Sequence, residues 1–148
     1  MGNGLLSKYR VLDVADELGI LCGRFLGDFG AEVIKVEKPE GDVARSKPPF
    51  YKDIPSPEHS LFWYYTNLHK KGITLNINTE TGKQLFKQLV KKSDVVVESF
   101  HPGYLDDLGL GYAELSKVNP GIILTSITPF GQEGPYSGCK ASDITLML

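Results

Sequence analysis

Residues 23–45 read GRFLGDFGAEVIKVEKPEGDVAR and indicate four successive pieces of structure. Apolar residues at helical spacing run into this stretch and predict a helix with one apolar stripe, formed by Leu18, Leu21, Cys22, Phe25, Leu26 and Phe29. Gly30 follows as the expected left-handed cap of that helix. The β-branched run at 33–36 predicts a buried strand, and residues 37–45 form a polar loop after it. This order is typical of a unit in which helices and strands alternate.

The rest of the chain repeats the alternation. Strands are expected at 10–14, 33–37, 73–77, 94–98 and 122–127, and helices at 16–29, 60–67, 79–92, 104–108, 113–118 and from 143 onward. Because alternating strands and helices pair in parallel through right-handed crossovers, we predict an α/β fold with a Rossmann-like, doubly wound parallel sheet over residues 1–148. Ligands bind such sheets at the carboxyl ends of the strands, which here lead into the loops 15–19, 37–45, 76–79, 98–103 and 128–142.

The composition is that of an ordinary globular domain and excludes several classes of function. The 148 residues are 41% hydrophobic and carry a net charge of −2, so nucleic acid is not an expected partner. Two cysteines are too few for a disulfide framework, and three histidines without ligand spacing give no expected metal site. The sequence has no signal-peptide pattern and no run of membrane-spanning length, so we expect a cytoplasmic protein without a membrane partner.

Several further motifs accompany residues 23–45 in a fixed order. They are NLHKKGITLNI at 67–77, DVVVESFHPGYLDDLGLGY at 94–112, NPGIILTSITPFGQEGPYSG at 119–138 and KASD at 140–143. Together they resemble the class III (family III) CoA-transferases, the group of formyl-CoA transferase, carnitine CoA-transferase and the bile-acid-inducible proteins. Because the likeness covers nearly the whole chain in separate motifs, it is far more specific than any one motif alone.

The resemblance implies an enzyme that moves CoA from an acyl-CoA donor to a carboxylic acid acceptor. In this family the catalytic residue is an aspartate in a Gly-Asp motif beyond the stretch that corresponds to 140–143, and it forms covalent intermediates with the acyl group and with CoA. We therefore expect residues 1–148 to be an N-terminal CoA-binding region that stops before the catalytic aspartate and a second domain. CoA is expected as a substrate, with no tightly bound cofactor.

The same resemblance names the residues expected to bind the coenzyme. Lys38 and Lys140 match basic residues near its phosphates, and Arg45 matches the loop pattern, where it either contacts the coenzyme or braces the loop. The other matching positions are Leu75, Asn76, Ile77 and Asn78, which line the adenine pocket in the family, and Ser99, Phe100 and His101 before Pro-Gly. The chain departs from the family at Asp107, where an arginine is common, and at Leu18 and Gly19, where formyl-CoA transferase has polar residues.

The resemblance also implies a homodimer of interlocked subunits. We therefore expect this chain to expose apolar surface, notably Leu61, Phe62, Trp63 and Tyr64 on the short helix.

Two alternatives remain. An α-methylacyl-CoA racemase shares the fold but needs a base on each face of the α-carbon, and the chain has Ser142 where that branch has a histidine. The other is a non-catalytic module for CoA binding or dimerisation.

Overall fold

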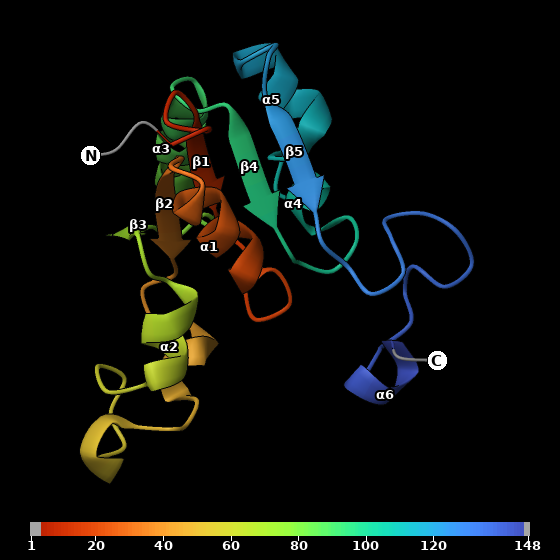
Figure 1. Ribbon diagram of the computed structural model, residues 1–148. Helices are drawn as coiled ribbons and strands as arrows, with labels where there is room; N and C mark the ends of the chain where they lie inside the picture. The colour runs from red at the N-terminus through yellow and green to blue at the C-terminus, as the bar shows by residue number, and fades with distance from the viewer. Residues whose placement is uncertain (1–3, 147–148) are drawn as a thin grey trace.

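Five strands form one parallel sheet at the centre of the computed structural model, which describes residues 4–146 except the side chains of residues 143 and 146 (Figure 1). The strands are β1 (Arg10–Asp13), β2 (Glu32–Glu37), β3 (Lys70–Thr74), β4 (Val95–Glu98) and β5 (Ile123–Ser126). Their order is β3-β2-β1-β4-β5, and every neighbouring pair is parallel. This confirms the predicted α/β class.

Helices cover both faces of the sheet. The longest are α1 (Ile20–Asp28) and α3 (Glu80–Val90); the others are α2 (Leu61–Thr66), α4 (Tyr104–Asp107), α5 (Tyr112–Val118) and α6 (Asp143–Leu146). The larger core packs side chains of α3, α4 and α5, including Phe86, Leu105 and Leu115, against Leu12 and Val96 of the sheet. A smaller core on the opposite face places α1 against β1, β2 and β4. Both faces are therefore buried, as the β-branched strands predict.

The segment between β2 and β3 lies beyond the carboxyl ends of the strands (Figure 1). It contains two short 3₁₀ turns, η1 (Val43–Ser46) and η2 (Tyr51–Asp53), followed by α2. Ser60 caps α2, because its hydroxyl accepts a hydrogen bond from the backbone N–H of Trp63. This segment forms one border of the carboxyl-end surface.

Two predicted boundaries were wrong. The first helix begins at Ile20 instead of residue 16, because residues 17–19 form a turn whose entry is fixed by hydrogen bonds between Asp16 and Ser99. The third strand is Lys70–Thr74 instead of 73–77, because these five residues pair with residues 33–37 of β2. Leu75 to Asn78 consequently follow the strand and do not belong to it. The glycine cap was predicted correctly, since Gly30 has φ +99°.

Burial also differs from expectation at two places. The apolar stripe of the first helix is divided: Cys22 and Leu26 pack on the sheet, whereas Leu18, Phe25 and Phe29 are exposed. On α2, Leu61 and Tyr64 are exposed as expected, but Phe62 is half-buried and Trp63 is only 9% exposed. Both pack in a small cluster with Ile20 and Ala44, and the guanidinium of Arg45 lies over the Trp63 ring. Within the described part of the chain, no helix is long and apolar enough to cross a membrane.

Candidate functional site

A cavity of about 180 Å³ opens at the carboxyl ends of the strands. Four loops line it: residues 14–16 after β1, residues 35–43 at the end of β2, residues 75–78 after β3, and Phe100 with Tyr104 after β4. The strand order reverses between β1 and β4, and the crevice at such a switch point is where open α/β sheets bind their ligands. The cavity is smaller than the 300–1,000 Å³ typical of sites that enclose a drug-sized ligand, so it suits one part of a larger molecule.

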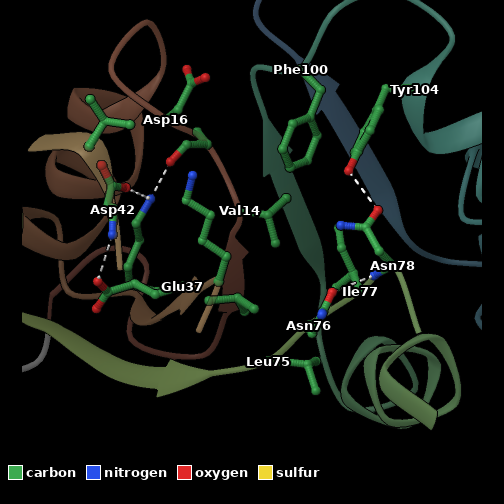
Figure 2. A pocket seen from close by; sticks show the side chains of 15 residues that line it. Val14, Asp16, Glu37, Asp42, Leu75, Asn76, Ile77, Asn78, Phe100 and Tyr104 are labelled. Carbon is green, nitrogen blue, oxygen red and sulfur yellow. Dashed lines mark hydrogen bonds and ion pairs between the residues drawn. The ribbon is translucent and has the colours of Figure 1, made fainter. Parts of the chain in front are cut away.

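One wall of the cavity is mainly apolar. Leu75, Ile77 and Phe100 contribute side chains to it, and the rings of Phe100 and Tyr104 lie 4.7 Å apart (Figure 2). The Tyr104 hydroxyl donates a hydrogen bond of 2.8 Å to Oδ1 of Asn78. An apolar slot with an amide at its edge has the chemistry that a heteroaromatic base requires.

Gly82 allows the segment after β3 to approach the first turn of α3. A Cβ atom at this glycine would lie 1.7 Å from the carbonyl oxygen of Asn76. That oxygen also accepts a hydrogen bond of 2.9 Å from the hydroxyl of Thr79, which caps α3 by accepting from the Gly82 N–H. The helix start therefore fixes the shape of the apolar wall.

The opposite wall carries charge. Figure 2 shows Asp16, Glu37 and Asp42 on the side facing Phe100 and Tyr104. Two of these carboxylates are neutralised: Arg45 pairs with Glu37 at 2.7 Å, and Lys35 pairs with Asp42 at 3.0 Å. The third, Asp16, accepts a hydrogen bond of 2.5 Å from the Ser99 hydroxyl.

Lys38 is the basic residue of this wall that remains available. It is exposed, it lines the cavity, and it pairs with no carboxylate among the side chains that the structure describes. An ammonium without a partner at the edge of an apolar slot suits an anionic group attached to a flat ligand.

A network of buried charges lies under the cavity and was not predicted from the sequence. Asp13 is fully buried between two lysines, with Lys70 Nζ at 2.7 Å and Lys35 Nζ at 3.8 Å. Burial lowers the pKa of Lys70, and the nearby Asp13 opposes that shift. Lys35 also donates to the carbonyl of Ala15, so it ties the loop after β1 to Asp42 in the loop after β2. The available signal was a charged residue inside each of two β-branched strands, VLDV and VIKVE.

The predicted site residues separate into three groups. Six line the cavity: Lys38, Leu75, Asn76, Ile77, Asn78 and Phe100. Arg45 and Ser99 lie behind it, where each holds a carboxylate of the charged wall. His101 belongs to a neighbouring cavity and Lys140 is an exposed residue that lines neither; the departure Asp107 is likewise exposed outside both.

The neighbouring cavity, of about 230 Å³, lies at the carboxyl ends of β4 and β5. Its buried carboxylate is Glu98, which accepts hydrogen bonds from the Phe100 N–H at 2.7 Å and from Gln132 Nε2 at 3.3 Å. Burial raises the pKa of Glu98, although hydrogen bonds from Ser126 and Phe100 oppose the shift. Glu98 thus connects the loop after β4 to the loop after β5. Across the described residues, no three His, Cys, Asp or Glu side chains are grouped so that they could hold a metal ion.

Known proteins are similar to this chain in sequence. The chain is 41% identical over 139 residues to a subunit of succinyl-CoA:(R)-benzylsuccinate CoA-transferase from Thauera aromatica, covering 94% of this chain and 34% of that protein. It is 38% identical over 140 residues to formyl-CoA:oxalate CoA-transferase from Streptomyces coelicolor, covering 94% and 33% of the two chains.

Solved structures agree with the sequence relatives. A crystal structure of a CAIB/BAIF family protein from Brucella suis superposes with a TM-score of 0.87 at 39% identity, covering 97% of this chain and 38% of that one. The chain therefore spans about a third of the length of the relatives that it matches. The family model of CoA-transferase family III matches residues 6–147, nearly the whole of the sequence, and the chain accordingly belongs to this family.

Proposed function

We propose that residues 1–148 form the coenzyme-binding layer of a CoA-transferase, which moves CoA from an acyl-CoA to a carboxylic acid. The observation that carries this proposal is the cavity at the carboxyl ends of β1, β2, β3 and β4, where an apolar slot adjoins Lys38, which has no carboxylate partner among the described side chains. Coenzyme A has a flat adenine ring and several phosphates, and these two features complement the two walls. Several relatives are named for the same reaction type, with succinyl-CoA or formyl-CoA as the donor.

The slot between Phe100, Ile77 and Leu75 would hold the adenine ring, and Asn78 would meet its polar edge. Lys38 would pair with a phosphate outside the slot. The remainder of the coenzyme would extend across the loops after β1 and β4 because the cavity of about 180 Å³ is too small for the whole molecule. Holding the thioester in a fixed place is the contribution that this layer would make to catalysis.

The chemical step proposed for the whole protein is covalent catalysis by an aspartate outside this chain. The carboxylate attacks the acyl-CoA carbonyl, CoA thiolate leaves, and a mixed anhydride forms. The thiolate then attacks the anhydride at the aspartyl carbonyl, which releases the donor acid and gives an enzyme–CoA thioester. The acceptor carboxylate next attacks the aspartyl thioester, which releases the CoA thiolate and forms a second anhydride. The thiolate finally attacks the acceptor carbonyl of this anhydride, which gives the new acyl-CoA and frees the aspartate. No residue of this chain is assigned to these steps.

The proposed assembly is an interlocked homodimer in the cytoplasm. Exposed apolar residues of α1 and α2, among them Leu21, Phe25, Leu61 and Tyr65, support coverage by further protein surface. Two relatives are named as subunits of their enzymes, so a dimer of two different chains is an alternative outcome for the same surface.

The experiment is an assay of the natural protein that contains this chain. It should be incubated in D₂O with succinyl-CoA or formyl-CoA and a panel of carboxylic acids, and separately with a 2-methylacyl-CoA alone. Mass spectrometry should find CoA on the acceptor acid and no deuterium at the α-carbon, because Ser142 cannot serve as the racemase base. Rapid α-deuteration without an acceptor would favour the racemase, and CoA binding without either reaction would favour the non-catalytic module.

A further inference from the structure

Arg45 makes its contacts on the outer side of the charged wall. Its Nε lies 2.7 Å from Oε2 of Glu37 and its NH2 lies 2.9 Å from Oε1, which is the bidentate arrangement that arginine forms with a carboxylate. Its NH1 lies 3.3 Å from Glu58, and the centre of its guanidinium is 4.0 Å from the centroid of the Trp63 ring. Arg45 is not among the residues that line the cavity.

Glu37, by contrast, does line the cavity and directly precedes Lys38. Its side chain is only 10% exposed, so solvent screens its charge less than at an open surface. Without a partner, this carboxylate would repel an anionic group bound to the adjacent ammonium. Loss of the Arg45 contact would also free the Glu37 side chain at the end of β2. In the structure, Glu37 Oε2 additionally accepts a hydrogen bond of 3.2 Å from the Asp42 N–H.

We propose that Arg45 is a positioning residue for phosphate recognition: it neutralises Glu37 so that the Lys38 ammonium can donate to the phosphates of CoA, and it does not touch the coenzyme itself. The inference rests on the proposed function, since it presupposes a phosphate-bearing ligand at Lys38. The sequence allowed two interpretations of Arg45, direct contact with the coenzyme and bracing of the loop. Direct contact would require a guanidinium that is free of Glu37. Bracing of the loop would affect ligands with and without phosphate equally.

The test compares two ligands and two charge states of the pair. Calorimetry on the natural protein should use CoA, which carries phosphates, and pantetheine, which carries none. Arg45→Met should raise the Kd for CoA about tenfold, because Glu37 is then uncompensated beside the phosphates, and should change the Kd for pantetheine by less than about twofold. The double variant Arg45→Met with Glu37→Gln should bind CoA within about threefold of the wild type.

The matched control is Arg24→Met. Arg24 has the same kind of environment as Arg45, with Asp28 at 3.3 Å and the ring of Tyr65 at 4.5 Å, but it lies on α1 away from the cavity. This variant should leave the Kd for CoA unchanged. Glu37→Gln alone should bind CoA at least as tightly as the wild type, which keeps the test decisive even if Arg45→Met folds poorly.

Three results would overturn the inference. A double variant no better than Arg45→Met would mean that the guanidinium itself contacts the phosphate. Equal weakening of CoA and pantetheine by Arg45→Met would mean that the residue only braces the loop. A wild-type protein that binds neither ligand would refute the proposed function and this inference with it, whereas CoA binding without rescue refutes the inference alone.

Discussion

Glu98 is a buried carboxylate, and its protonation should change the free energy of unfolding of the protein. Burial is the main cause of its raised pKa. The folded state therefore holds this proton more tightly than the unfolded state, so the resulting stabilisation is complete below the ordinary glutamate pKa and is lost as the pH rises through the raised pKa of the folded state.

Glu98→Gln should remove this pH dependence while keeping an oxygen that accepts from the Phe100 N–H. We expect the variant to gain stability relative to the wild type as the pH rises from about 4 to 7. Urea denaturation of both proteins at these two pH values measures the difference. An identical difference in the free energy of unfolding at both pH values would contradict the assignment of a raised pKa to Glu98.

The sequence predicted which loops several site residues belong to, but not which side chains they contact. Lys38, Ile77 and Phe100 were correctly expected near one another, because the carboxyl ends of parallel strands meet at one edge of a sheet. The partner of Arg45 could not be predicted, since pairing with Glu37 and stacking on Trp63 depend on distances that only the folded loops define. His101 follows the same strand as Phe100 but lies in the neighbouring cavity, although both rings pack against Tyr104.

At the scale of elements, the junction between β3 and α3 determines one wall of the site. Gly82→Ala would place a methyl group against the backbone oxygen of Asn76, which is part of the wall and cannot move like a flexible side chain. We expect this variant to lose about 2 kcal/mol or more of unfolding free energy, as is typical of backbone clashes in a packed site.

The control for this prediction is Gly27→Ala in α1. A Cβ there would lie 3.5 Å from His69 and Val33, which is an ordinary contact, and alanine favours a helix over glycine by about 0.5–1 kcal/mol. Thermal or urea denaturation should therefore find Gly27→Ala as stable as the wild type or more so. Equal stability of the two variants would mean that the wall can yield at Asn76.

Helices and strands with a strong local residue pattern were predicted at the right place, whereas those whose bounds depend on distant contacts were not. Strands in the middle of the sheet, such as Val95–Glu98, carry enough β-branched residues to be recognised. The edge strand Lys70–Thr74 has no such pattern, and its pairing with β2 rather than its side chains decides where it begins. The start of α1 was misplaced because Asp16 is held by a hydroxyl 83 positions away in the sequence, a contact that no local pattern records.

In the molecule as a whole, helices cover both faces of the sheet, but apolar side chains on and next to α1 and α2 remain exposed. Leu18, Phe25 and Phe29 are each more than half exposed, and so is Tyr65 on the adjoining α2. Isolated exposed apolar residues are ordinary, whereas several on two neighbouring elements are compatible with coverage by further protein surface.

In the proposed function, CoA binds in the cavity between the loops after β1, β2, β3 and β4. Hydrogen exchange followed by mass spectrometry, on the natural protein with and without saturating CoA, tests it directly. Amide exchange should slow in peptides that cover residues 14–16, 35–43, 75–78 and 98–104, because these segments line or support the cavity. It should remain unchanged in α5, whose residues lie outside the cavity. Bound CoA that leaves these four segments unprotected would contradict binding in this cavity.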